Sequence, residues 1–266
     1  MKIEEINLSG SNKSGVRPDF MYANMLDQMR YIYALKYVRD KRVLDFACGV
    51  GWGSYLMALA GASKVVAVDL SLEAITTAEK YYSEPKVQYI CNNLEKVEIP
   101  EESIDIITCF ETFEHLENPR AIMDIFHRII SADGILLLST PNGYATKYLP
   151  QDRPANPFHY NEYYRDEFEK IVADQWEIVE YRGQFIMKSD SRAIFKYRKF
   201  VRDYFIGLKL ARNFGIFGRF IKLVLRKLGI LSLNEPAFKD KCEPVVVLGG
   251  CEPAYHYYIL KPKILK

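Results

Sequence analysis

The chain has 266 residues, 49% of them hydrophobic and 26% charged, with a formal net charge of +2. This is the composition of an ordinary globular protein, and it excludes collagen-like and low-complexity chains. No run reaches the roughly 18 apolar residues of a membrane-spanning helix, and the polar N-terminus carries no signal-like segment, so we expect a cytoplasmic protein.

The first half of the chain predicts alternating helices and strands. A helical pattern over residues 22–38 leads into the first strand. Asn118 and Pro119 are suited to the N-cap and first position of a later helix. Near-continuous apolar strands separated by helices indicate a parallel sheet covered on both faces, which binds ligands at the carboxyl ends of its strands. The expected strands are 42–46, 64–70, 87–91, 104–110 and 134–140, and the expected helices are 71–82 and 118–130.

The second half predicts a helix at 166–175, a strand at 176–185 and a final strand at 254–262. Between the last two strands, residues 190–241 show two amphipathic helix patterns and no strand pattern. We therefore expect three parts: an N-terminal helical cap, 1–41, a core formed by 42–189 and 242–266, and a helical insertion, 190–241.

The expected insertion is strongly basic. Between Arg192 and Lys227 it holds eleven Lys or Arg residues and one acid, Asp203. Two compatible interpretations fit it: a lid whose basic face is solvated, or a surface that meets an anionic partner such as a membrane leaflet or the diphosphate of a nucleotide sugar. The first interpretation is favoured. No recognition motif supports nucleic acid as a partner.

The five cysteines are odd in number and have no CxxC spacing. This indicates reduced, buried thiols rather than a disulfide framework or a zinc site, and no metal is expected.

A glycine-rich loop, VLDFACGVGWGS, follows the first strand. Gly49, Gly51 and Gly53 give a GxGxG spacing, which is neither the GxGxxG of dinucleotide sites nor a P-loop. Asp45, at the end of the strand, would repel a phosphate and suits a cationic ligand. Asp69 ends the next strand, where a carboxylate can accept hydrogen bonds from both hydroxyls of a ribose.

With VVAVDLS, IDIITCFETFEHL and GILLLSTPNG, this loop resembles the class I S-adenosylmethionine-dependent methyltransferases over about residues 22–185. The resemblance implies a Rossmann-like sheet of seven mostly parallel strands with helices on both faces. It also implies a reversed last strand, which the late run at 254–262 fits. The cofactor would be S-adenosylmethionine and its product S-adenosylhomocysteine.

The resemblance also implies which residues contact the cofactor. Asp45 and the loop backbone would hold the methionine part, and Asp69 the ribose. Asn93 stands where the family usually has an acid that faces the adenine amino group. Arg30 either pairs with the cofactor carboxylate or is a surface charge on its helix. The full predicted set is Arg30, Asp45, Ala47, Gly49, Gly51, Asp69, Leu70, Asn93, Leu94 and Phe110.

Methyl transfer is an in-line displacement that often needs a base to deprotonate the acceptor. His115 follows the fourth strand, and His159 lies in the loop after the fifth, so both are expected at the carboxyl edge. His159 is weighted slightly above His115, because His115 belongs to an EHL motif found with many specificities. Glu111, beside the sulfonium, and Glu114 are lesser candidates.

The segments FETFEHLENP, STPNG and NPFHYNEYYRDEFEKI further resemble the branch of these enzymes found with polysaccharide and glycan biosynthesis. That resemblance implies O-methylation of a sugar hydroxyl. The aromatic side chains of residues 158–164 either stack on the sugar ring or pack the loop, and packing is the commoner use of such residues. The alternatives are a quinone-like or other small metabolite as acceptor, and a non-catalytic cofactor-binding protein at the inner face of a membrane.

Overall fold

The computed structural model describes residues 18–146, 158–184, 245–246 and 255–263. The predicted basic insertion, 190–241, and its choice between lid and anionic contact lie outside these residues. The strands are β1 (Arg42–Phe46), β2 (Lys64–Asp69), β3 (Val87–Cys91), β4 (Ile104–Phe110), β5 (Ile130–Pro141), β6 (Trp176–Gln184), β7 (Val245–Val246) and β8 (Tyr255–Pro262). The helices are α1 (Pro18–Ala34), α2 (Trp52–Leu59), α3 (Leu72–Tyr81), α4 (Pro119–Ile129), α5 (Gly143–Thr146) and α6 (Arg165–Val172), with 3₁₀ turns η1 (Leu94–Lys96) and η2 (Phe113–His115).

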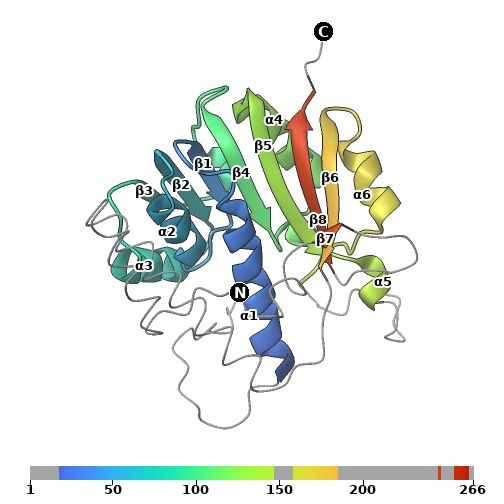
Figure 1. Cartoon of the computed structure of the whole chain (residues 1–266), viewed down its shortest axis with the longest axis horizontal. Helices are drawn as coiled ribbons and strands as arrows, with labels where there is room; N and C mark the ends of the chain where they lie inside the picture. The colour runs from blue at the N-terminus through green and yellow to red at the C-terminus, as the bar shows by residue number, and fades with distance from the viewer. Residues whose placement is uncertain (1–17, 147–157, 185–244, 247–254, 264–266) are drawn as a thin grey trace, which may run out of the picture.

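The strands form one twisted sheet in the order β3-β2-β1-β4-β5-β8-β6-β7 (Figure 1). Strands β1 to β5 pair in parallel, and β8 inserts antiparallel between β5 and β6. The predicted Rossmann-like sheet of seven main strands with a reversed last strand is therefore confirmed. The two-residue β7 at the edge was not predicted.

Helices cover both faces of the sheet, α1 and α2 on one and α4 and α6 on the other (Figure 1). Neighbouring residues of one strand point to opposite faces, as the pleat requires. In β4, Ile106 packs into the cluster under α1 and α2, whereas Ile107 packs into the cluster under α4 and α6. Both faces of the central strands are thus buried, which explains their near-continuous apolar sequences.

The helix starts follow from local sequence. The Asn118 side chain accepts a hydrogen bond from the Ala121 amide, and Pro119 begins α4, as predicted. The first helix spans 18–34 rather than the expected 22–38. Helix α2 was not predicted, because its eight residues begin inside the glycine-rich loop.

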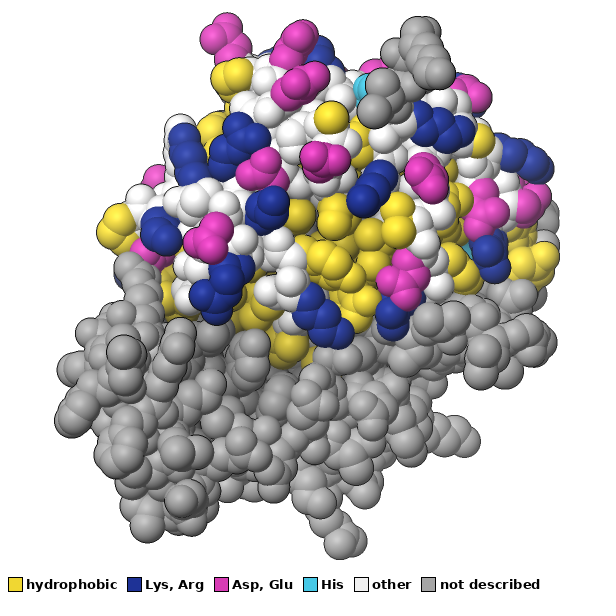
Figure 2. Space-filling model, turned by 45° about the horizontal axis from the view of Figure 1, so that its top comes forward, with side chains coloured by type: hydrophobic (Ala, Val, Ile, Leu, Met, Phe, Trp, Pro, Cys, Tyr) yellow, Lys and Arg dark blue, Asp and Glu magenta, His cyan; other side chains and the backbone are white. Residues whose placement is uncertain are grey.

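Figure 2 shows Lys and Arg side chains intermingled with Asp and Glu around an apolar area on the described part of one face. Among the described residues, no helix is long and apolar enough to cross a membrane.

Candidate active site

The glycine-rich loop turns sharply between β1 and α2. Ala47, Gly49 and Gly51 all have positive φ, at 58°, 54° and 81°. Glycine adopts this conformation without strain, whereas Ala47 adopts it at a cost. A Cβ added at Gly49 would meet no heavy atom within 4 Å. Gly49 therefore borders open space, as expected where a ligand approaches the backbone.

The other two glycines are required by packing within the protein. A Cβ on Gly51 would lie 2.6 Å from the Ala78 Cβ, and one on Gly53 would lie 2.1 Å from the Tyr31 ring. The three glycines thus have different roles. Gly49 leaves space beside the loop, and Gly51 and Gly53 let α2 approach its neighbours closely.

Asp45 lies behind the loop and is completely buried. Its carboxylate accepts hydrogen bonds from Tyr31 Oη (3.0 Å), Ser54 Oγ (2.5 Å) and Thr108 Oγ1 (2.7 Å). Burial raises the pKa of Asp45 to about 6, and the hydroxyl donors oppose this rise. The carboxylate fixes the loop to α1 and β4, and its predicted contact with the cofactor stays a prediction.

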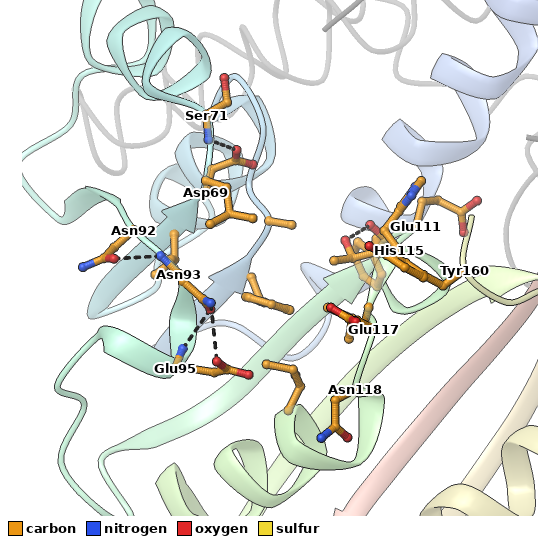
Figure 3. A pocket seen from close by; sticks show the side chains of 18 of the residues that line it. Asp69, Ser71, Asn92, Asn93, Glu95, Glu111, His115, Glu117, Asn118 and Tyr160 are labelled. Carbon is orange, nitrogen blue, oxygen red and sulfur yellow. Dashed lines mark hydrogen bonds between the residues drawn. The ribbon is translucent and has the colours of Figure 1, made fainter. Parts of the chain in front are cut away.

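A pocket of about 1230 Å³ opens at the carboxyl ends of β1, β2 and β4 (Figure 3). It exceeds the roughly 300–1,000 Å³ of most small-molecule sites, which leaves room for a cofactor and an acceptor together. Seven of the predicted site residues line it: Ala47, Asp69, Leu70, Asn93, Phe110, Glu111 and His115. Five others, Arg30, Asp45, Gly49, Gly51 and His159, are not among the lining residues, and nothing is described of the Leu94 side chain.

Asp69 and Asn93 lie on one wall of the pocket (Figure 3). The Asp69 carboxylate accepts from the backbone amides of Gly49 (2.8 Å) and Ser71 (2.9 Å). Each of its oxygens has a second lone pair that can accept from a ligand hydroxyl. The Asn93 side-chain oxygen accepts from the Glu95 amide (3.1 Å).

Glu111, His115 and Tyr160 lie on the opposite wall (Figure 3). Glu111 has a positive φ of 49° and accepts from Ser139 Oγ at 2.9 Å. Burial raises the pKa of Glu111 to about 8, and Arg30 opposes this rise. A cationic ligand group beside Glu111 would favour its ionised form.

Arg30 lies behind Glu111, and only 1% of its side chain is exposed. Its Nη1 lies 3.2 Å from Glu111 Oε1 and also pairs with Asp27, while its Nε donates to Gln184 Oε1 (2.8 Å). Arg30 is therefore not a surface charge. Its predicted contact with the cofactor carboxylate remains a prediction.

The two histidines proposed as bases meet at one end of the pocket. Their rings lie edge to face with centroids 4.7 Å apart, and His115 alone lines the pocket. His115 Nδ1 donates to the Phe158 carbonyl oxygen (2.8 Å), and His159 Nδ1 is 2.7 Å from Glu162 Oε1. Burial lowers the pKa of His159, against the effect of Glu162.

A second acid, Glu114, lies beside this pair, with its Oε1 3.9 Å from His115 Nε2. Its Oε2 accepts from Thr140 Oγ1 (2.9 Å), and its backbone oxygen accepts from the Tyr160 amide (2.8 Å), which fixes the loop that carries His159. Burial raises the pKa of Glu114 to about 7. One ligand atom from each of Glu114, His115 and His159 lies within 4.8 Å of the others, so these residues could hold a metal ion.

Sequence reasoning missed two sets of residues. Glu162, which orients His159, could have been found from the HxxE spacing within one loop. Ser54 and Thr108, whose hydroxyls donate to Asp45, belong to no sequence motif that points to this contact. Thr108 is also 63 positions away from Asp45 in the sequence.

Comparison with known proteins agrees with this geometry. Residues 44–138 match a family model described as "Methyltransferase domain". A Mycobacterium tuberculosis protein named "Probable S-adenosylmethionine-dependent methyltransferase" is 33% identical over 133 residues, covering 50% of this chain and 47% of the relative. A "Ubiquinone biosynthesis O-methyltransferase" of Neisseria meningitidis serogroup C is 32% identical over 126 residues, covering 46% and 53%.

Solved structures share the fold. An S-adenosylmethionine-dependent methyltransferase from Mesorhizobium loti has a TM-score of 0.56 at 14% identity, covering 89% of this chain and 99% of that one. The [4+2]-cyclase SpnF has a TM-score of 0.52 at 15% identity, covering 88% and 80%, so the fold alone does not define a reaction.

Residues 44–138, which run from β1 into β5, thus match a methyltransferase domain, and the relatives that match this part of the chain include proteins named as S-adenosylmethionine-dependent methyltransferases. The cofactor named for these relatives is S-adenosylmethionine, and the open space at Gly49 and the carboxylate of Asp69 fit it. The chain spans about half the length of the curated relatives it matches.

Proposed function

We propose that the protein transfers the methyl group of S-adenosylmethionine to a hydroxyl oxygen of a small molecule or glycan. The observation that carries this proposal is a large pocket that has Asp69 on one wall and Glu111 and His115 on the other. Asp69 would accept from the ribose hydroxyls, and Leu70 would lie against the adenine. Glu111 would lie near the positive sulfonium and favour its binding.

The acceptor would enter beside His115. The attacking oxygen must lie in line with the sulfur–methyl bond, whose electron pair returns to sulfur as S-adenosylhomocysteine forms. His115 and His159 are the groups that we propose to control the hydroxyl proton, with Glu111 nearer to the methyl group. His115 lines the pocket, whereas His159 contacts His115 from behind, which now favours His115 as the group that touches the acceptor.

The first candidate acceptor is a sugar hydroxyl. This reading rests on the resemblance to the glycan-associated branch and on the aromatic side chains near the pocket. Tyr160 lines the pocket with 61% of its surface exposed, and Phe158 is also largely exposed. Exposed rings of this kind suit stacking on the apolar face of a sugar.

A phenolic hydroxyl of a quinone precursor is the second candidate. Several relatives, including the Neisseria meningitidis protein, are named for ubiquinone biosynthesis, which favours this acceptor class. Tyr160 would stack on an aromatic acceptor as well as on a sugar.

The test is to incubate the full chain with S-adenosylmethionine and two acceptor panels, one of nucleotide sugars and oligosaccharides and one of catechols and quinone precursors. S-adenosylhomocysteine formation is measured, and cofactor binding is followed separately by calorimetry. Turnover with one panel identifies the acceptor class. No turnover with any acceptor, together with no cofactor binding, rejects the proposal.

A further inference from the structure

Glu114, His115 and His159 form a compact cluster at the acceptor end of the pocket. Glu114 and His115 belong to η2, and His159 comes from the segment that precedes α6. One ligand atom from each residue lies within 4.8 Å of the other two. Two imidazoles and one carboxylate with an open side are a donor set typical of divalent transition-metal ions.

Each potential ligand is oriented by a second residue. His115 Nδ1 is 2.8 Å from the Phe158 carbonyl oxygen, which can only accept, so this nitrogen carries the proton and Nε2 presents a lone pair. His159 Nδ1 is 2.7 Å from Glu162 Oε1, which favours the same tautomer. Such outer partners accompany nearly all metal-binding histidines and raise their basicity.

The carboxylate is arranged in the same way. Glu114 Oε2 accepts from Thr140 Oγ1 at 2.9 Å, and its Oε1 faces His115 Nε2 at 3.9 Å. That gap is too long for a hydrogen bond. It matches the separation of two ligands of one ion, since metal–ligand bonds of about 2.0–2.2 Å place two ligand atoms roughly 3–4 Å apart.

The cluster is enclosed on the protein side and open toward the pocket. Exposure of the side chains rises from 1% for Glu114 through 11% for His159 to 39% for His115. His115 also lines the cofactor pocket. Three protein ligands with coordination positions left open toward a substrate are the arrangement of catalytic rather than structural metal sites.

We propose that Glu114, His115 and His159 bind a divalent transition-metal ion that coordinates two adjacent hydroxyl oxygens of the acceptor. This inference rests on the proposed function and narrows its substrate class to a vicinal diol or a catechol. The ion lowers the pKa of the hydroxyl it binds, whose proton leaves to solvent water. The oxygen forms a bond to the methyl carbon as the sulfur–carbon bond breaks, and the ion keeps its oxidation state. The histidines then act as ligands and do not themselves accept the proton.

The first experiment measures binding of the metal alone. The full chain is treated with a chelator, dialysed, and titrated with Zn²⁺ and Co²⁺ by calorimetry, with visible absorption recorded for Co²⁺. We expect one equivalent to bind, and His159→Ala and Glu114→Gln to weaken binding at least tenfold. Glu162→Gln removes only the orienting carboxylate and should weaken binding roughly 10- to 100-fold.

His127→Ala is the matched control. His127 lies on α4, contacts the Lys263 carbonyl oxygen and takes no part in the cluster, so this variant should bind the ion as the parent does. Circular dichroism and S-adenosylmethionine affinity show whether each variant is folded. No saturable binding to the parent protein overturns the proposal, and so does binding that His159→Ala and Glu114→Gln leave unchanged, which identifies an adventitious ion.

The second experiment uses turnover. Chelation should abolish methyl transfer and Co²⁺ or Zn²⁺ should restore it, and an acceptor that lacks one of the two adjacent hydroxyls should react far more slowly. Full turnover in the presence of chelator overturns the metal proposal while the methyltransferase function stands. Failure of the function itself appears separately, as loss of cofactor binding.

Discussion

Asp69 is the residue at which the cofactor wall of the pocket can be tested most directly. Its carboxylate already organises the loop through the Gly49 and Ser71 amides and keeps further acceptor capacity toward the pocket. Hydrogen bonds to charged groups contribute about 1.5–3 kcal/mol each. The Asp69 carboxylate is thus placed to make a large contribution to ribose binding.

Asp69→Ala should raise the Kd for S-adenosylmethionine and for S-adenosylhomocysteine by about the same factor, roughly 10- to 150-fold. Calorimetry measures both constants. Asp105→Ala is the control, because Asp105 pairs with Arg42 at the start of β4, away from the pocket. Unchanged affinity in Asp69→Ala would remove Asp69 from the cofactor site.

The buried carboxyl of Asp45 predicts a pH dependence of stability. Burial raises its folded-state pKa from 3.8 to about 6, so the folded protein binds this proton more tightly than the unfolded chain does. The resulting stabilisation is complete below about pH 4 and is lost as the pH rises through 6. Asp45→Asn cannot titrate and should lack this effect.

Relative to Asp45→Asn, the parent protein should therefore lose about 2.4 kcal/mol of unfolding free energy between pH 4 and pH 7. Urea unfolding at a series of pH values measures the difference. Asp105→Asn provides a control of opposite sign, because Arg42 lowers the pKa of Asp105 to about 2 and that contribution is lost as the pH falls. A difference that is flat with pH for Asp45→Asn would contradict the prediction.

At the scale of elements, different glycines of the glycine-rich loop serve packing and ligand approach. A methyl group at Gly53 would enter the ring of Tyr31 on α1, which is itself held by its hydrogen bond to Asp45. A methyl group at Gly49 would enter open space, so only the positive φ opposes it.

Gly53→Ala should therefore cost more stability than Gly49→Ala. Overpacking costs about 1–3 kcal/mol or more, whereas a non-glycine residue at positive φ costs about 1–2 kcal/mol. Urea unfolding of the two variants compares them directly. Equal losses of unfolding free energy, or a larger loss in Gly49→Ala, would show that Gly53 does not pack closely against the Tyr31 ring of α1.

Elements with strong periodicity were predictable from the sequence. The five parallel strands and α4 with its Asn118 cap follow from local apolar patterns, which tertiary contacts reinforce. Helix α2 was not predicted, because the glycines at its start obscure its apolar pattern. Strand β7 was not predicted either, because two residues are too few to show a periodic pattern.

The site was predictable where a residue ends a strand and unpredictable where distant segments meet. Asp69 and Phe110 were expected at the carboxyl edge because parallel strands end there together. The contact between His115 and His159 spans 44 positions and depends on backbone hydrogen bonds from their loops to each other, which no local pattern encodes.

At the scale of the whole molecule, Arg30 joins elements that are far apart in the sequence. From α1 it pairs with Glu111 at the end of β4 and donates to Gln184 at the end of β6. It also lies over the Tyr255 ring of β8, 4.6 Å from its centroid. The first helix is thus connected to the parallel and the antiparallel parts of the sheet through one buried cation.

At a pH above 8, where Glu111 is ionised, Arg30→Met should destabilise the protein by about 3 kcal/mol or more, because it leaves a carboxylate that is only 22% exposed without its cation. Replacing both partners, as Arg30→Met with Glu111→Gln, should recover much of the loss, since the unpaired charge rather than the missing pair causes most of the penalty. Urea unfolding of the two single variants and the double variant forms a complete cycle.

The surface pair of Arg42 and Asp105 gives the matching control, because Arg42→Met should cost no more than about 1 kcal/mol. The penalty in Arg30→Met should also grow with pH, since Glu111 must lose its proton without a neighbouring cation. If the double variant is as unstable as Arg30→Met, the contacts to Gln184 and Tyr255 rather than the charge of Glu111 hold α1 in place. The wall of the pocket that carries Glu111 would then be formed independently of the helix behind it.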